Sequence, residues 1–172
     1  PPTGSRGEAA AAGRRLRLGH ISYSNCFPVH CRFFDAPRAG DPELVERGVV
    51  HYATTPNPGE KGNSVIFGHS SSNILNKGKY KFAFLLLKSL ENEDTFIIQK
   101  DGKRYVYKVY NKFVTNPEDL SVLNPTDREA TMTLITCDPP GTSTNRLIIQ
   151  AEQIFPDPSG NAESSVQQAN VS

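Results

Sequence analysis

The chain has 172 residues and a formal net charge of +1 at pH 7, from 19 basic and 18 acidic side chains. This length fits one domain, and balanced charge without blocks of like sign argues against nucleic acid or a charged membrane surface as the partner. The 13 prolines, the 13 glycines, the absence of tryptophan and a mean hydropathy of −0.46 are typical of a soluble, loop-rich domain with much β-structure.

Both ends of the chain are polar. Residues 1–15 are small or polar and carry no amphipathic pattern that would dock a helix, so we predict a disordered linker there. The folded domain is then predicted over residues 16–155. The polar composition of residues 156–172 predicts a disordered C-terminal tail.

Residues 16–47 have the weakest secondary-structure pattern of the predicted domain. Residues 16–18 begin an alternating strand pattern, which residues 19–40 do not continue. A short helix is predicted over 41–48, with Asp41 as its N-cap. Two interpretations of residues 19–40 stay open. Either the encoding DNA carries a compensated frameshift, or this first segment of the domain is genuine and specific to the protein's lineage.

The same region holds four side chains of zinc-binding type, His20, Cys26, His30 and Cys31. Their spacing matches no common pair-and-pair zinc scheme, and coincidence is the simpler interpretation. We therefore predict no metal site and no cofactor. Together with Cys137 the chain has three cysteines, an odd number that leaves at least one free thiol.

The middle of the chain predicts strands and one short helix. Residues 63–67 form an apolar strand that ends at Gly68-His69, whereas His51 is predicted to be structural or at a pocket rim. The apolar residues in 82–90 favour a short packed helix. Asp101-Gly102 lies between two alternating runs of β-formers, which is the strongest short-range hairpin signal.

The last third of the chain carries a cysteine at the end of a predicted strand. A helical turn capped by Asn116 and a loop over 122–128 lead to residues 133–137, whose composition favours a half-buried strand. The Asp-Pro-Pro-Gly that follows must end this strand. Cys137 is therefore placed where a rigid strand meets a loop, a suitable position for a nucleophile.

Three separated motifs resemble those of the sortases, the cysteine transpeptidases that attach proteins to the bacterial cell surface. They are Gly68-His69-Ser70, the Thr-Leu-Ile-Thr-Cys of residues 133–137, and Arg146 at the start of an apolar strand. The resemblance runs from about residue 48 to residue 155, with the motifs in the family's order. It implies a mainly β fold with one or two short helices, a closed eight-stranded barrel of the sortase type.

The residue types in these motifs fit acyl transfer. A cysteine attacks as the thiolate, which nearby positive charge favours, and a histidine can protonate a departing amine. Arg146 offers a planar fork of donors to a carbonyl or oxyanion, and it lies nine positions after the cysteine. A loop and a return along a neighbouring strand would bring it beside the sulfur. Cys137, His69 and Arg146 are therefore the predicted catalytic residues.

The resemblance also implies a substrate and a location. Cys137 would attack the Thr–Gly bond of a Leu-Pro-x-Thr-Gly-like sorting signal, and an amine of the cell wall or of a pilin would resolve the thioacyl enzyme. Leu120, Val122 and Leu123 would belong to the wall of the peptide groove, and Thr136 would add a substrate contact. The domain would lie on the extracytoplasmic face of the bacterial membrane, tethered through an N-terminal anchor that this chain lacks.

Other interpretations stay open on the sequence alone. A papain-like protease places its cysteine at a helix start early in the chain, and an L,D-transpeptidase carries a Ser-x-Gly-Cys-type motif that is absent here. A non-catalytic or degenerate sortase-like β-domain acting in binding or adhesion would leave Cys137 as an inert thiol.

Overall fold

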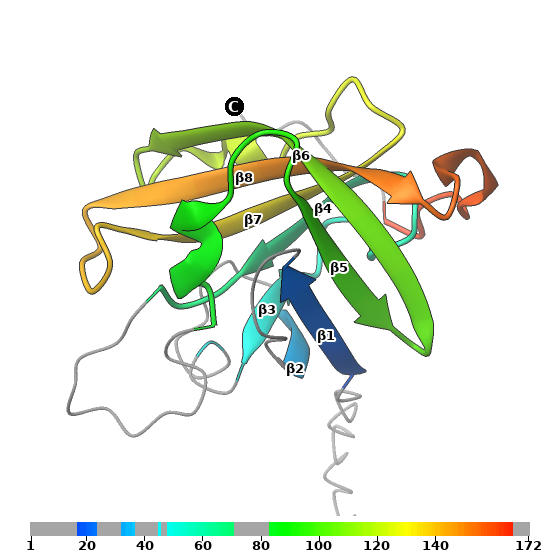
Figure 1. The fold of residues 1–172 in the computed structure, drawn as a ribbon, viewed down its shortest axis with the longest axis horizontal. Helices are drawn as coiled ribbons and strands as arrows, with labels where there is room; N and C mark the ends of the chain where they lie inside the picture. The colour runs from blue at the N-terminus through cyan, green and yellow to red at the C-terminus, as the bar shows by residue number, and fades with distance from the viewer. Residues whose placement is uncertain (1–16, 24–31, 37–44, 46–47, 71–82, 167–172) are drawn as a thin grey trace, which may run out of the picture.

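The computed structural model describes residues 17–23, 32–36, 45, 48–70 and 83–166. Strands dominate this part of the chain, and the helices are short 3₁₀ turns (Figure 1). The strands are β1 Arg17–Tyr23, β2 Arg32–Ala36, β3 Val49–Tyr52, β4 Gly62–Phe67, β5 Thr95–Lys100, β6 Lys103–Thr115, β7 Ala130–Asp138 and β8 Asn145–Phe155. The 3₁₀ helices are η1 Leu85–Ser89, η2 Leu120–Leu123 and η3 Pro158–Gly160.

The strands form one strongly curled sheet. They pair in the order β1-β2-β3-β4-β7-β8-β6-β5, and β1 pairs with β5 as well as with β2. The β2–β3 and β4–β7 pairs are parallel, and the others are antiparallel. The predicted mainly β class with few short helices is confirmed.

The predicted hairpin is present between β5 and β6. Asp101 and Gly102 both have positive φ, 52° and 75°, as a two-residue turn that follows the twist of its strands requires. The second strand is longer than predicted, because a bulge between Val109 and Asn111 shifts the alternation and β6 continues to Thr115 beside β8.

The inside of the curled sheet is apolar. Its buried cluster receives side chains from β3 to β8 and from η1, including Phe84, Phe96, Tyr107, Leu134 and Ile149. The short helix predicted within 82–90 is confirmed as η1, which contributes Leu87 to this cluster. Burial inside the sheet is the main source of the fold's stability.

The outer side of β4, β7 and β8 is covered as well. Val65, Ile135 and Ile148 pack there against Val122 and Leu123 of η2. The prediction that this strand is half-buried is therefore wrong for one of its faces, because every residue of β7 from Ala130 to Thr136 is buried. The alternation predicted along this strand nevertheless separates its two apolar surfaces.

The connection before β7 differs from its prediction. The helical turn is η2, which begins three residues later than expected, and it is capped by Asp119, which accepts from the Ser121 N–H at 3.0 Å. Asn116 instead accepts from the Glu118 N–H at 2.9 Å within a turn. Both residue types make such local bonds, so the sequence does not distinguish a turn from a helix cap.

The first part of the predicted disordered tail is ordered. After β8, residues 156–166 include η3, and the backbone of Ala162 bridges to Glu60 and accepts from the Lys61 N–H at 3.0 Å. Asn161 also exchanges hydrogen bonds with Gln153. A polar composition did not reveal this order, because polar and backbone contacts with distant strands hold the segment.

Several predictions fall outside the described residues. They are the linker over 1–15, the side chains of the four candidate zinc ligands, and most of the helix over 41–48, of which Val45 is helical. Within the described part of the chain, no helix is long and apolar enough to cross a membrane.

Candidate active site

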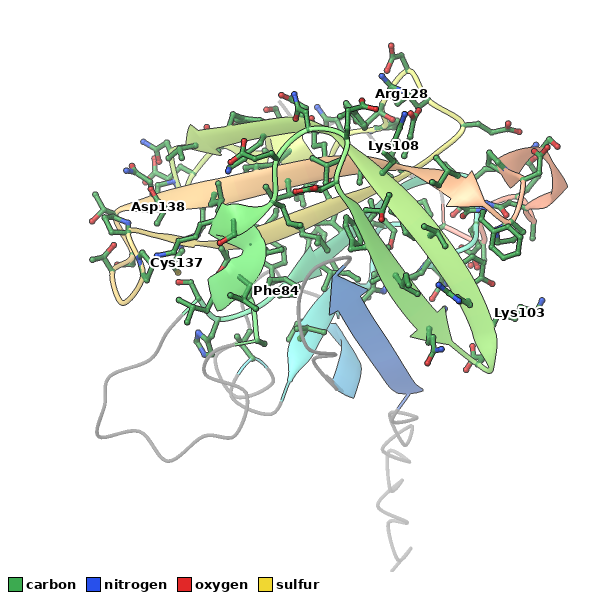
Figure 2. All side chains as sticks on the ribbon, viewed as in Figure 1. Phe84, Lys103, Lys108, Arg128, Cys137 and Asp138 are labelled. Carbon is green, nitrogen blue, oxygen red and sulfur yellow. The ribbon has the colours of Figure 1, made fainter. Side chains whose placement is uncertain are left out.

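Cys137 lies near the carboxyl end of β7. Its thiol is unbridged and partly exposed, whereas the preceding residue Thr136 is 3% exposed. The strand leaves the covered part of the sheet at this point and continues into the Pro139-Pro140-Gly141 loop. Figure 2 shows Cys137 and Asp138 at one end of the sheet, opposite the tip of the β5–β6 hairpin at Lys103.

Arg146 lies directly opposite Cys137. The antiparallel register of β7 and β8 pairs the two residues, and the Arg146 Nη1 atom is 3.7 Å from the Cys137 sulfur. The same nitrogen donates to the carbonyl oxygens of Ser143 at 3.3 Å and of Asn145 at 3.1 Å. The return strand expected from the spacing therefore brings a permanent cation to the thiol.

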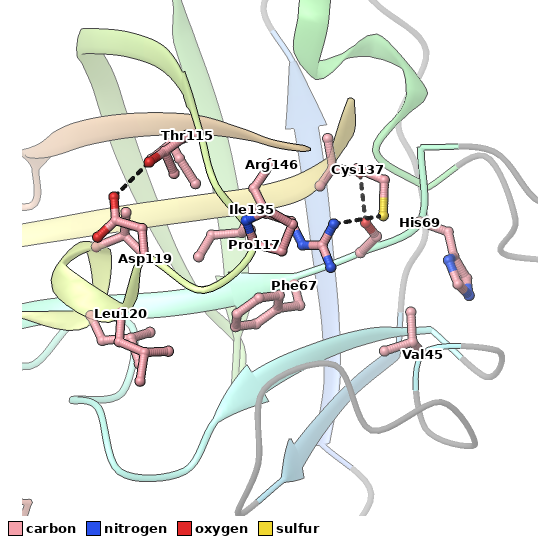
Figure 3. A pocket seen from close by; sticks show the side chains of 15 residues that line it. Val45, Phe67, His69, Thr115, Pro117, Asp119, Leu120, Ile135, Cys137 and Arg146 are labelled. Atoms are coloured by element: carbon pink, nitrogen blue, oxygen red, sulfur yellow. Dashed lines mark hydrogen bonds between the residues drawn. The ribbon is translucent and has the colours of Figure 1, made fainter. Parts of the chain in front are cut away.

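His69 follows the end of β4, on the other side of the cysteine in Figure 3. The backbone of Gly68 and His69 is held by β7 and by the residue that precedes η1. Gly68 N–H donates to the Ile135 carbonyl at 3.1 Å, the Thr136 hydroxyl donates to the Gly68 carbonyl at 2.7 Å, and Phe84 N–H donates to the His69 carbonyl at 2.8 Å. The turn that carries the imidazole is thus bonded to the strand that carries the thiol.

Gly68 is required by close packing at this turn. A Cβ atom at Gly68 would lie 2.7 Å from the ring of Phe84, a distance that real side chains do not tolerate. Phe84 is fully buried in the interior cluster and has little room to move. The glycine therefore lets the histidine turn lie directly on the core.

The three predicted catalytic residues line one groove of about 340 Å³ (Figure 3). Its floor consists of β4, β7 and β8, and one wall is the β6–β7 connection with η2. The lining residues are Val45, Phe67, Gly68, His69, Thr115, Pro117, Asp119, Leu120, Val122, Leu123, Ile135, Thr136, Cys137, Arg146 and Ile148.

The groove has an acidic group away from the cysteine. Hydrogen bonds from the hydroxyl groups of Ser121 and Thr115 hold the pKa of Asp119 below its usual range. The Thr115 hydroxyl donates to Asp119 at 2.6 Å (Figure 3). This carboxylate therefore fixes the start of η2 while Arg146 supplies the positive charge beside the thiol.

The predicted substrate-contact residues play different parts in the structure. Leu120 is 48% exposed at the groove, whereas Val122 and Leu123 are 7% and 4% exposed and mainly pack the wall against the floor. Thr136 lines the groove, but its hydroxyl is bonded to the Gly68 carbonyl. His51 is 4% exposed and bonded to the Pro56 carbonyl at 2.9 Å, as expected of a structural histidine.

Sequence reasoning missed several groove residues. Phe67 and Ile135 are neighbours in the β4–β7 register, and Ile148 lies two positions after Arg146 on β8. The strand period of two from the catalytic positions would have found Ile135 and Ile148. Val45 lies far away in the sequence and gave no such signal. Among the described residues, no three His, Cys, Asp or Glu side chains gather to hold a metal ion.

A mainly β domain with a cysteine, an arginine and a histidine on one groove defines a candidate cysteine acyl-transfer site. The model of the sortase domain family matches residues 28–154. The chain therefore belongs to the sortase family. No curated protein sequence matches it.

Solved sortase structures resemble the chain over most of its length. A lid mutant of sortase A from Corynebacterium diphtheriae is 25% identical, with a TM-score of 0.66, over 87% of this chain and 76% of that one. The pilus-related sortase C of Group B Streptococcus is 27% identical, with a TM-score of 0.65, over 80% and 67%. A sortase C from Actinomyces oris is 25% identical, with a TM-score of 0.63, over 79% and 73%.

Proposed function

We propose that this protein is a cysteine transpeptidase that cleaves a Leu-Pro-x-Thr-Gly-like sorting signal between Thr and Gly and transfers the new acyl group to a cell-surface amine. The observation that carries this proposal is the pairing of Cys137 with Arg146 across β7 and β8, with 3.7 Å between sulfur and guanidinium. His69 borders the same groove from the turn after β4.

The first half of the proposed reaction forms a thioester. The Cys137 thiolate attacks the Thr carbonyl carbon, so that an S–C bond forms and the carbonyl oxygen becomes an oxyanion, which Arg146 is suited to receive. As the oxyanion collapses, the C–N bond to Gly breaks. His69 gives its proton to the departing amine.

The second half releases the product and restores the Cys137 thiolate. An amine of the cell wall or of a pilin attacks the thioester carbonyl and loses a proton to His69, and the C–S bond breaks. The sulfur leaves as the thiolate, so the product is a new amide rather than an acid. No oxidant, metal or cofactor enters this balance.

The groove supports an extended peptide with apolar side chains as the acyl donor. Leu120 is exposed on its wall, and the partly buried Phe67 lies on an apolar floor that includes the buried side chains of Ile135 and Ile148. Burial of one aliphatic side chain there is worth roughly 1.5–3 kcal/mol, enough to contribute to binding. We propose Leu120, Val122, Leu123 and Thr136 as the substrate-binding residues of the groove, with the exposed Leu120 in direct contact with the peptide and the other three shaping the surface beneath it.

The proposal includes the setting of the enzyme. We propose that the paired strands form the closed eight-stranded barrel of sortases, that residues 16–155 are its catalytic domain, and that it works on the extracytoplasmic side of a bacterial membrane. Family membership supports each of these statements.

Intact-mass spectrometry with a Leu-Pro-x-Thr-Gly peptide library tests the proposal. The unaltered protein should gain the mass of the acyl fragment up to Thr, and Cys137→Ala should gain nothing. Added hydroxylamine should remove the adduct, because a thioester is cleaved by strong amine nucleophiles. Absence of an adduct, with a thiol that does not react with iodoacetamide, would favour a non-catalytic binding domain instead.

A further inference from the structure

One fully buried amide side chain joins the floor of the groove to its wall. Asn63 lies on β4, is 0% exposed and is paired in register with Thr131 of β7. Its Nδ2 donates to the carbonyl oxygens of Val122 at 3.2 Å and of Asn124 at 2.9 Å. The Thr133 hydroxyl of β7 donates to the Asn63 Oδ1 at 2.8 Å.

The chemistry of the amide explains why asparagine stands there. A primary amide has two N–H donors on one side and a carbonyl acceptor on the other. Asn63 directs both donors to backbone carbonyls at the end of η2 and its acceptor to β7. A carboxylate would supply no donor, and a hydroxyl would supply one.

These bonds hold one end of the groove wall, and a different residue holds the other end. Asp119 fixes the start of η2 through the Ser121 N–H and the Thr115 hydroxyl. Asn63 fixes its end through the Val122 and Asn124 carbonyls, next to the Val122 and Leu123 side chains that pack on the floor. The position of the wall relative to the floor therefore depends on Asn63.

Asn63 is not one of the residues that line the groove, so it has no direct route to the reacting atoms. We propose that Asn63 is a positioning residue that sets the width of the peptide groove and thereby the binding of the acyl donor. This inference rests on the proposed function. Preorganisation of this kind acts on affinity, because a loose wall must be ordered again on binding.

The test compares Asn63→Thr with Thr133→Val. Threonine is close to asparagine in size and favours a strand, but its single hydroxyl cannot bond both carbonyls of η2. Thr133→Val removes a hydrogen bond to the same amide and leaves both bonds to η2 in place. Asn63→Ala serves as a second variant if Asn63→Thr does not fold.

We expect Asn63→Thr to raise the KM for the sorting peptide about tenfold or more with kcat little changed, since only ground-state organisation is lost. Thr133→Val should keep its KM. The rate at which iodoacetamide alkylates Cys137 should be the same in both variants and in the unaltered protein. A residue that only stabilises the fold would lower the unfolding midpoint and leave KM unchanged.

Hydrogen exchange provides a readout that needs no turnover. The Asn124 amide, bonded to the Ser121 carbonyl at 3.0 Å, should exchange faster in Asn63→Thr but not in Thr133→Val, while the β4–β7 amides stay protected. If none of the peptides acylates the unaltered protein, the proposed transpeptidase function fails. The exchange measurement still decides whether Asn63 holds the wall. Unchanged KM or unchanged Asn124 exchange in Asn63→Thr would overturn the inference.

Discussion

The register of β7 and β8 places Arg146 next to the Cys137 thiol. It pairs with Cys137 across β7 and β8, and the Ser143 and Asn145 carbonyls bind the same guanidinium nitrogen. The guanidinium is planar and cannot lose its charge, so its direction is set by these contacts. A lysine at the same position would carry the charge but not the fork.

Arg146→Lys should therefore lower kcat for peptide cleavage about 100-fold or more, as loss of an oxyanion donor does in acyl transfer. The reason is that a lysine ammonium cannot contact the Cys137 sulfur and the oxyanion together with the geometry of the guanidinium fork. Steady-state kinetics with the preferred peptide measure the effect, and an unchanged unfolding midpoint serves as the control. Full activity of the lysine variant would rule out a directional role for the guanidinium.

Ser64 places a hydroxyl inside the apolar sheet. It is 2% exposed, faces the interior beside Met132, and its Oγ has no hydrogen-bond partner in the described part of the chain. Burial of an unsatisfied hydroxyl costs about 1–3 kcal/mol relative to water.

Ser64→Ala should accordingly raise the free energy of unfolding, by about 1 kcal/mol. Thr133→Val is the matched opposite case, since its hydroxyl is bonded to Asn63, and it should lower the free energy by about 1 kcal/mol. Urea unfolding at constant pH measures both. A destabilised Ser64→Ala would mean that its hydroxyl has a partner in solution.

At the scale of elements, β4 and β7 act together to place the histidine. Their parallel ladder runs from Gly62↔Ala130 to Phe67↔Ile135, and the Thr136 hydroxyl continues it to the Gly68 carbonyl. Residues of the two strands are far apart in sequence, yet one side-chain bond joins the turn bearing His69 to the strand bearing Cys137.

Thr136→Val should reduce kcat by about 10- to 100-fold, because a small displacement of the imidazole removes the aligned geometry. Thr136→Ser keeps the hydroxyl and should restore most of the rate. Kinetics of both variants, with KM determined separately, check this. Equal loss in the serine and valine variants would assign the effect to packing rather than to the hydrogen bond.

The residue that caps η2 makes the stability of the fold depend on pH. The pKa of Asp119 is lowered in the folded state by the hydroxyls of Ser121 and Thr115. A lowered folded-state pKa stabilises the fold above the unfolded pKa of about 3.9, and this stabilisation is lost as pH falls through the folded pKa.

Unfolding free energy should therefore fall more steeply from about pH 5 to about pH 2 in the unaltered protein than in Asp119→Asn. The gap between the two proteins should be largest above pH 5 and should shrink with acid. Denaturant titrations over this range test the sign. A constant gap at all pH values would remove Asp119 as the titrating group.

At the scale of the whole molecule, the sheet depends on its first strand. β1 pairs with β2 through Arg17↔Phe33 and Leu18↔Arg32, and with β5 through five further residue pairs. Through β5 it supports Phe96 and Ile98, which are fully buried in the interior cluster. Loss of β1 would leave β2 and β5 with unpaired backbone edges.

Deletion of residues 1–23 should lower the thermal midpoint by about 10 °C or more and broaden the transition, since edges and core become exposed together. Deletion of residues 1–15, the predicted linker, is the matched control and should leave the midpoint unchanged. Calorimetry of both truncations measures this. If the protein without β1 unfolds with the same enthalpy and an equally sharp transition, the remaining strands fold as a unit.

The sequence alone determined the features that depend on short stretches of chain. Asp101-Gly102 predicted its hairpin because few residues accept two positive φ angles in succession. The apolar run and the Pro-Pro-Gly after it placed Cys137 at a strand end, and the spacing to Arg146 predicted its return beside the sulfur. The family motifs added His69 and the sortase fold.

The tertiary structure decided what distant segments do to one another. β7 is buried on both faces because η2 covers it, Asn63 binds carbonyl groups 59 and 61 positions away, and residues 156–166 are ordered by contacts with Glu60 and Lys61. Each of these features depends on which chain segments meet, and hydrophobic period and turn chemistry describe only neighbours along the chain. The groove that joins Cys137, Arg146 and His69 is therefore a property of the assembled sheet.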